Sequence, residues 1–255
     1  MMEECVNKKT LKPYPLGWKA KIGILLPAHD TGYGSYEFRV LCPEGVVTLE
    51  TRVMGGRLTL EELQKMRADA VYGARLLAVA EPDVICYIAT AACFVLGVEG
   101  EKALVKEIQD KTGIQAVSGG SSVVEAFRFL GVKRISMYVP TNEEITRLSI
   151  KYFEDQGFEV RDCESLGEES IANINRMSAW ELYGNIMKLY RKSPDVDGIF
   201  VTGGCFRILE SLDALEKDMG KPVVMTTAAN MWRCLQLVGV KDPIYGFGQL
   251  LEKPR

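Results

Sequence analysis

Short apolar runs alternate with longer amphipathic stretches along nearly the whole chain, and this alternation limits the folds open to it. The runs are typical of buried strands, whereas the stretches between them repeat apolar residues with helical spacing. Strands and helices that alternate in this way predict an α/β fold with parallel sheets. The predicted strands are residues 21–27, 46–53, 83–89, 114–119, 134–140, 158–165, 197–203, 222–227 and 243–247. The predicted helices are residues 59–80, 99–113, 121–131, 141–157, 178–193, 207–220 and 228–239.

Several predicted helix ends carry residues that commonly start or stop helices. Thr141 followed by Glu144 fits a capping box at the start of the helix over 141–157. Gly131, Gly157 and Gly220 fall where C-terminal caps belong, because glycine adopts the left-handed conformation of such caps without strain.

Two stretches of the chain are similar to each other. DVICYIATAACF (83–94) and DGIFVTGGCF (197–206) each run from Asp through a strand and small residues to Cys-Phe. Each is followed by a helix, a strand, a cluster of Ser or Thr, and a second helix that closes on Gly-Val-Lys. We interpret this as an internal repeat that predicts two pseudo-symmetric, doubly wound lobes with a cleft between them. The expected lobes are residues 1–120 with 228–255, and residues 121–227.

Composition and charge argue against several classes of partner. The chain has 255 residues and a net charge of −3, so it lacks the basic surface that nucleic-acid binding requires. No run approaches the roughly 20 apolar residues of a membrane span, and the N-terminal residues contain no apolar signal segment. We therefore expect a cytoplasmic protein that binds neither nucleic acid nor membrane.

The sequence also lacks the usual signatures of metal and cofactor sites. There is one histidine and no CxxC pair, so neither a His-rich zinc site nor a structural zinc is expected. No GxGxxG follows a strand, which argues against a dinucleotide site, and neither GxxxxGK[ST] nor the GxSxG elbow of hydrolases occurs. The seven cysteines are expected to be free thiols, with Cys42, Cys86 and Cys234 as small core residues.

Cys93 and Cys205 follow the two similar strands. Ligands of parallel α/β sheets bind beyond the carboxyl ends of the strands, so both thiols are candidate catalytic groups, as base or nucleophile. Thr90-Ala91 and Gly203-Gly204 precede predicted helices and offer backbone amides to an anion. A thiol at such a helix N-terminus has a lowered pKa. The alternative is that both cysteines are buried packing residues and that Thr90 is a helix cap.

Three further side chains are candidates for contact with a substrate. Thr227 follows a strand and could supply a hydroxyl donor. Arg207 either pairs with a second substrate carboxylate or is a solvated arginine in a first helical turn. His29, in the glycine- and aromatic-rich segment 29–38, either binds a carboxylate or transfers protons, or it is a surface residue. The segment itself could line or cover the cleft.

The chain resembles the aspartate/glutamate racemase superfamily, and within it the branch of arylmalonate decarboxylases and maleate isomerases. The resemblance is carried by ILLPAHD (24–30), ATAACF (89–94), GVKRISMYVPTNEEITR (131–147) and DGIFVTGG (197–204), in this order and spacing. It implies two lobes with the active site between them and no metal or organic cofactor. It also implies proton transfer beside a carboxylate, or thiolate addition to a carbon–carbon double bond. Pro27 is a substrate-binding candidate on this basis.

The resemblance breaks down at the expected catalytic positions. Racemases and maleate isomerases of this superfamily use one cysteine per lobe, and the decarboxylases use one in the second lobe. Here those positions fall on Ala89 and Gly203, and the nearest cysteines follow four and two residues later. Thr90 falls on a family hydroxyl that helps to hold the carboxylate, and Thr141 falls where a tyrosine is common.

These observations predict a cofactor-independent isomerase or decarboxylase that acts on a small dicarboxylate or a 2-substituted malonate. Two thiols across the cleft would favour a racemase or an isomerase, and one thiol would favour a decarboxylase. The alternatives are an amino-acid or hydantoin racemase that uses both cysteines, and a carboxylate-binding homologue without activity. The expected partner is a small carboxylate, and a homo-oligomer stays open.

Overall fold

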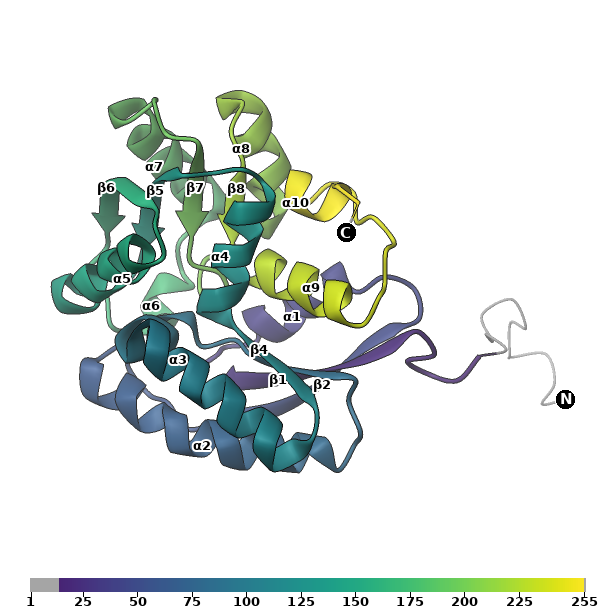
Figure 1. The fold of residues 1–255 in the computed structure, drawn as a ribbon. Helices are drawn as coiled ribbons and strands as arrows, with labels where there is room; N and C mark the ends of the chain where they lie inside the picture. Colours follow the sequence, from purple (N-terminus) through teal and green to yellow (C-terminus); the bar gives the residue numbers. More distant parts are fainter. Residues whose placement is uncertain (1–13, 255) are drawn as a thin grey trace, which may run out of the picture.

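Two four-stranded parallel sheets form the framework of the molecule. The computed structural model describes residues 14–254, so Cys5, one of the seven cysteines, lies outside the described residues. The sheets have the orders β2-β1-β3-β4 and β6-β5-β7-β8 (Figure 1), so β1 to β4 correspond in position to β5 to β8. The strands are β1 Ala20–Pro27, β2 Val46–Val53, β3 Val84–Tyr87, β4 Gln115–Ser118, β5 Arg134–Val139, β6 Glu159–Ser165, β7 Gly198–Val201 and β8 Val223–Met225. The predicted α/β fold with two pseudo-symmetric lobes of parallel sheet is confirmed.

Helices flank both sheets. They are α1 Tyr33–Leu41, α2 Leu60–Ala78, α3 Thr90–Thr112, α4 Gly119–Phe129, α5 Glu143–Asp155, α6 Ile171–Ile174, α7 Ala179–Lys192, α8 Leu212–Met219, α9 Thr226–Leu237 and α10 Gln249–Glu252, with a 3-10 turn at Leu209–Ser211. None of the helices between residues 14 and 254 combines the length and apolar character that a membrane-spanning helix needs.

The chain crosses between the two lobes after the last strand of each sheet. Helix α4 follows β4 but contacts β8 of the second sheet, and α9 follows β8 but contacts β3 and β4 of the first. The two helices pack against each other between the sheets (Figure 1). This exchange supports our proposal that the lobes are residues 1–120 with 228–255, and residues 121–227.

Three predicted elements were wrong or wrongly placed. The strand over 243–247 is a turn, because Gly246 has a φ of +84° and Ile244 donates its N–H to Leu251 O instead of to a sheet. The segment 29–38, for which no helix was predicted, is mostly part of helix α1. Asp30 explains its stability, since this carboxylate accepts the N–H groups of Gly32 (2.7 Å) and Gly34 (3.0 Å). The helix over 207–220 begins only at Leu212.

The cap predictions had mixed outcomes. The capping box at Thr141 was wrong, because the residue that caps α5 is Asn142, whose Oδ1 accepts the Ile145 N–H at 3.1 Å. Thr141 is buried instead, with its hydroxyl 2.9 Å from that of Thr146. The glycines predicted at 131, 157 and 220 do end helices, with φ angles of +72°, +86° and +64°.

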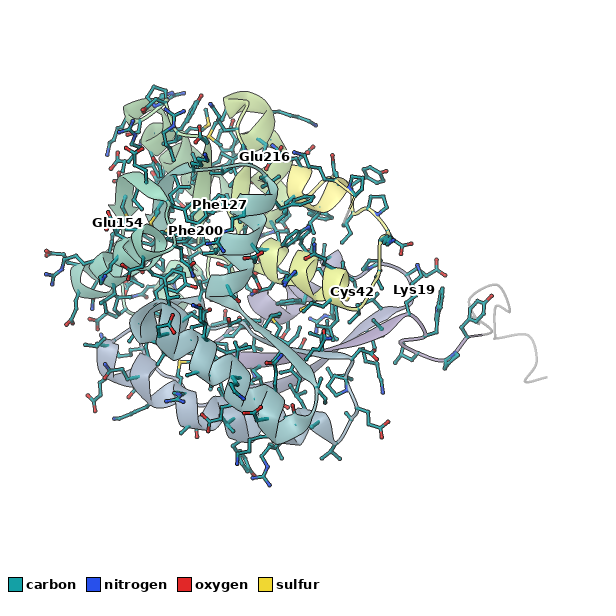
Figure 2. All side chains as sticks on the ribbon, in the orientation of Figure 1. Lys19, Cys42, Phe127, Glu154, Phe200 and Glu216 are labelled. Atoms are coloured by element: carbon teal, nitrogen blue, oxygen red, sulfur yellow. The ribbon has the colours of Figure 1, made fainter. Side chains whose placement is uncertain are left out.

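An aromatic cluster joins the first lobe to the second. Phe94 of α3 packs against Tyr152 and Phe153 of α5 and against Phe200 of β7, with ring centroids 4.9, 5.3 and 5.9 Å apart. Phe127 of α4 extends the cluster, and it and Phe200 are labelled in Figure 2. Aromatic contacts of this kind bury large apolar areas, so they fix the two lobes against each other.

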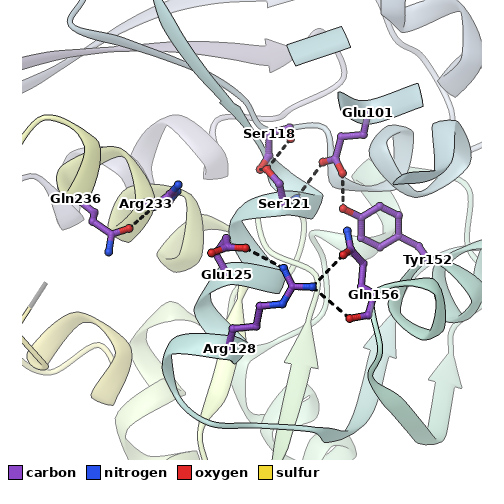
Figure 3. Close-up of polar contacts among 9 residues, drawn as sticks. All are labelled: Glu101, Ser118, Ser121, Glu125, Arg128, Tyr152, Gln156, Arg233 and Gln236. Carbon is purple, nitrogen blue, oxygen red and sulfur yellow. Dashed lines mark hydrogen bonds and ion pairs between the residues drawn. The ribbon is translucent and has the colours of Figure 1, made fainter. Parts of the chain in front are cut away.

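A buried carboxyl reinforces the same contact (Figure 3). Glu101 of α3 is 3% exposed and accepts the Ser121 N–H of α4 at 3.0 Å as well as the Tyr152 hydroxyl of α5. Both carboxyl oxygens therefore have donors, one from each neighbouring helix.

Glu101→Ala should lower the free energy of unfolding by about 3 kcal/mol, because the Ser121 amide and the Tyr152 hydroxyl would lose their acceptor inside the protein. Urea denaturation would measure the loss. Glu99→Ala on the same helix is the control: Glu99 is exposed and pairs only with Lys102, so its loss should stay below about 0.5 kcal/mol. Equal losses in the two variants would contradict the role of the buried network.

Candidate active site

A cavity opens between the lobes at the carboxyl ends of β1, β3, β5 and β7. These are the two central strands of each sheet, so the pseudo-symmetry brings four strand ends to one place. The cavity volume is about 70 Å³, room for several water-sized groups. It is lined by Pro27, His29, Asp30, Leu58, Leu63, Met66, Ile88, Ala89, Thr90, Ala91, Ala92, Phe94, Val139, Pro140, Thr141, Ser149, Ile171, Thr202, Gly203, Gly204 and Cys205.

The first lobe offers backbone amides to this cavity. Helix α3 begins at Thr90, directly after the cavity residue Ala89, and breaks at Gly97, whose φ is +69°. The N–H groups of Ala91 and Ala92 belong to the first turn of α3, where amides have no intrahelical acceptor. Amides in this position favour an anion. Thr90 and Ala91 thus line the cavity, and their binding of an anion stays a prediction.

The second lobe offers one thiol. Cys205 lies in the turn after β7 and lines the cavity with only 6% of its surface exposed. Its backbone carbonyl accepts the Asn175 Nδ2–H at 2.5 Å, which ties the turn to the end of α6. Burial, with a smaller contribution from the nearby Glu37 carboxyl, raises the pKa of the Cys205 thiol to about 12.

This environment differs from the expected one. We expected a thiol at a helix N-terminus with a lowered pKa, but α8 starts at Leu212 and a turn follows Cys205 instead. Without the field of a helix N-terminus, desolvation decides the pKa. Cys205 is thus a protonated thiol at neutral pH.

Gly203, where the family resemblance places a cysteine, has no room for a side chain. A Cβ added there would lie 2.7 Å from Thr227 Oγ1 and 2.8 Å from Thr227 N, closer than real Cβ contacts allow. The thiol of this lobe can therefore occupy Cys205 but not Gly203 while Thr227 keeps its position.

Beneath this turn lies a buried carboxyl that the sequence interpretation missed. Glu37 of α1 is 1% exposed, and its Oε2 accepts the Thr227 hydroxyl at 2.7 Å. Its Oε1 is buried without a hydrogen-bond partner. Desolvation is the main reason that the pKa of Glu37 rises to about 8. A lone acid in a predicted loop gave no periodic signal of burial, so only the packing of α1 reveals it.

His29 stands at the end of β1. It lines the cavity, and its Nδ1 is buried without a partner. Burial lowers the pKa of His29, so the imidazole is neutral near pH 7. Arg52 holds the neighbouring segment by donating to Ala28 O (3.1 Å) and Asp30 O (2.9 Å). His29 is thus a fixed, neutral group that could donate or accept one hydrogen bond.

The structure brings eight of the predicted site residues to the cavity and leaves three outside it. Those that line it are Pro27, His29, Thr90, Ala91, Thr141, Gly203, Gly204 and Cys205. Cys93 is wholly buried behind them, and burial next to Glu101 raises the pKa of its thiol. Arg207 is exposed and pairs with Glu210 at 3.2 Å. Thr227 points to Glu37 beneath the turn.

The cysteines of residues 14–254 are free thiols: Cys42, Cys86, Cys93, Cys163, Cys205 and Cys234. Cys86 and Cys234 are fully buried. Across residues 14–254, no group of three His, Cys, Asp or Glu side chains is placed to hold a metal ion.

Comparisons with known proteins identify the family. The model of the arylmalonate decarboxylase family matches residues 48–251. The chain belongs to this family. It is 23% identical over 199 residues to arylmalonate decarboxylase of Bordetella bronchiseptica, covering 78% of this chain and 83% of that protein. The resemblance to the arylmalonate decarboxylase and maleate isomerase branch, and the expectation of an enzyme of this superfamily, are confirmed.

Solved structures of the same branch share the fold. A maleate isomerase of Pseudomonas putida S16, crystallised with maleate, has a TM-score of 0.86 at 22% identity, covering 91% of this chain and 97% of that chain. A maleate cis-trans isomerase of Nocardia farcinica with a covalently bound succinylcysteine intermediate has a TM-score of 0.84 at 19% identity, covering 91% and 98%. At this identity the likeness establishes the two-lobed architecture.

Gly203→Ala should lower the free energy of unfolding by about 1–3 kcal/mol, because the added methyl group meets Thr227. Gly184→Ala in α7 is the control: its Cβ would meet nothing within 4 Å, so it should stabilise the helix by up to about 1 kcal/mol. Thermal unfolding would compare the two. If Gly203→Ala were as stable as the wild type, the turn would be looser than the structure shows.

Glu37→Gln should become more stable than the wild type as pH rises from about 4.5 to about 8. Over that window the unfolded wild type loses the Glu37 proton near 4.5, whereas the folded protein keeps it until about 8, so rising pH favours unfolding. The gain in unfolding free energy should reach about 5 kcal/mol above pH 8 and vanish below pH 4.5.

Urea denaturation at pH 5 and at pH 8.5 would measure this gain, with the same substitution at the exposed Glu154 as the control. A gain of the same size at both pH values would show that the substitution acts by packing and not by ionisation.

Proposed function

We propose that the protein decarboxylates a small malonate that carries one apolar substituent at C2, without a cofactor. The observation that carries the proposal is that the cavity holds one thiol, Cys205, in its protonated form, beside bare amides of α3. A protonated thiol suits an enzyme that delivers a proton to carbon. It does not suit one that attacks a double bond, because the thiolate is the nucleophilic form.

The amides at the start of α3 support the binding of a carboxylate. When one carboxylate of a malonate leaves as CO₂, the electron pair of the broken C–C bond moves into the remaining carboxylate and forms an enediolate. Donors already aimed at that position stabilise the developing charge most strongly. Ala91 and Ala92 supply amides, and the cavity lining also holds the hydroxyls of Thr90 from the first lobe and Thr141 from the second.

Cys205 is proposed to complete the reaction. Its S–H bond breaks as the proton passes to C2 of the enediolate, which forms the new C–H bond. The thiolate left behind regains a proton from solvent, so each turnover consumes one proton and releases one CO₂.

The remaining walls support an apolar substituent. The apolar side chains of the lining include Leu58, Leu63, Met66, Phe94 and Ile171. The lining, as far as residues 14–254 define it, contains no lysine or arginine. A second carboxylate that stayed on the substrate would thus lack a cationic partner, which favours a leaving carboxylate over a retained one. Arg207, the predicted partner of a second substrate carboxylate, pairs with Glu210 instead.

Among the relatives, arylmalonate decarboxylase matches a cavity with one thiol better than the two-cysteine enzymes do. Both a racemase and a maleate isomerase of the superfamily type need a thiol from each lobe. Cys93 is fully buried, outside the cavity lining. The position of Ala89, where the first-lobe thiol would be expected, presents a methyl group instead.

Cys205→Ala should reduce turnover of phenylmalonate or an alkylmalonate at least 1,000-fold, on the order of what loss of a catalytic proton donor removes. Proton NMR in D₂O would follow product formation and the incorporation of deuterium at C2, with maleate, aspartate and glutamate as parallel substrates.

Cys93→Ala is the matched control, because it removes an equally buried thiol that does not reach the cavity. It should keep activity within a few-fold of the wild type. Turnover that survives Cys205→Ala would move the proton donor to another group, such as His29. Turnover of maleate, aspartate or glutamate in place of any malonate would overturn the decarboxylase proposal, and turnover of no compound would favour a carboxylate-binding homologue.

A further inference from the structure

Glu37 is a buried acid without a cation. No lysine, arginine or histidine forms an ion pair with it among residues 14–254, and its Oε1 has no hydrogen-bond partner. An isolated buried carboxylate is strongly disfavoured relative to its neutral form. The proposed reaction does not use Glu37, so its presence in the core needs a reason.

The packing links Glu37 directly to the turn that carries Cys205. The Thr227 hydroxyl donates to Glu37 at 2.7 Å, and the same Oγ1 sits 2.7 Å from where a Cβ of Gly203 would lie. The Gly204 N–H is close enough to the carboxyl to lower its pKa. Glu37, Thr227 and the Gly203–Cys205 turn therefore form one packed unit, with the acid beneath it and the cavity above.

Two acids in one dry region cannot both ionise easily. Glu37 is among the groups that raise the pKa of Cys205, because like charges repel more strongly where solvent is excluded. The other charged groups that face the pair have the same sign: Asp30 faces both Glu37 and Cys205, and Glu210 faces Glu37. Backbone amides and the Thr227 hydroxyl partly stabilise each charge, but no cation of the described residues is among the groups that act on Glu37 or Cys205.

We propose that Glu37 is a positioning residue that controls the ionisation of Cys205, so that the thiol can lose its proton while Glu37 is neutral and is held protonated once Glu37 is ionised. This inference deepens the proposed function, on which its catalytic meaning rests, because a thiol that donates a proton leaves a thiolate beside Glu37. The neutral carboxyl of Glu37 does not repel that thiolate. The Gly204 N–H and the Thr227 hydroxyl, which face Glu37, hold the turn in place.

The test follows alkylation of Cys205 by iodoacetamide, which needs no substrate. Rates would be measured from pH 6 to pH 10 by mass spectrometry of the peptide that contains Cys205, in the wild type and in Glu37→Gln. At pH 6.5, where Glu37 is neutral, the two rates should agree within about twofold. At pH 9 the variant should react about tenfold faster, since one pKa unit of the thiol is a tenfold change in thiolate.

Glu210→Gln is the matched control, because it removes an exposed carboxylate that also faces Glu37. Its rates should follow the wild type at both pH values. A Glu37→Gln rate that differs from the wild type by one constant factor at every pH would overturn the proposal, since a merely structural effect would not follow the titration of Glu37.

A second variant covers the case in which Glu37→Gln does not fold. In the wild type, the plot of log rate against pH should flatten near pH 8, where Glu37 ionises and opposes the thiolate. Thr227→Val removes a hydrogen bond that lowers the pKa of Glu37, so the flattening should move to higher pH. A steady rise without flattening in both proteins would overturn the proposal. If these profiles hold but no malonate turns over, the control by Glu37 stands and the proposed reaction fails.

Discussion

The contact of Phe94 with the aromatic residues of the second lobe is the interaction on which the rest of the site depends. Phe94 lies one turn into α3, whose first amides face the cavity, and its ring packs against α5 and β7. It also lines the cavity itself. Because one side chain both joins the lobes and closes the site, the anion-binding helix and the Cys205 turn are held at a fixed separation.

Around this contact, the pseudo-symmetry of the fold supplies two different kinds of group. The central strands of the first sheet end in His29 and at the start of α3, while those of the second end in Thr141 and in the Cys205 turn. One lobe therefore provides hydrogen-bond donors for a carboxylate, and the other provides a thiol. Two halves with the same topology can thus carry different groups, because their loops differ: a proton donor in one half and an anion site in the other.

Burial governs the chemistry of this site more than charge pairing does. Cys205, Glu37 and His29 all have pKa values moved toward the neutral form of the group, and desolvation is the largest cause in each case. A neutral thiol and a neutral imidazole therefore line the cavity, with a neutral acid beneath the Cys205 turn. Such an arrangement reserves the few available amide donors for the substrate's own negative charge.

The sequence by itself determined the parts of the protein that depend on local pattern. Alternating apolar runs fixed eight of the nine predicted strands, and the repeated Asp-strand-Cys-Phe unit indicated two lobes. The order of motifs such as ATAACF and DGIFVTGG indicated the family. These features can be predicted because the spacing of apolar residues and the residues at helix ends are patterns between positions close in the chain. Segment 243–247 was misread because Gly246 turns the chain where apolar residues alone predicted a strand.

Only the tertiary structure decided which candidate residues meet. Cys93 and Cys205 have the same sequence context, yet packing buries Cys93 within the first turn of α3 and leaves Cys205 in the cavity lining. Thr227 closes the space at Gly203. Helix α1 carries Glu37 beneath the same turn, where it accepts the Thr227 hydroxyl although 190 residues separate Glu37 from Thr227 in the chain. The physical reason is that desolvation and close packing depend on neighbours from distant segments, which no local pattern records.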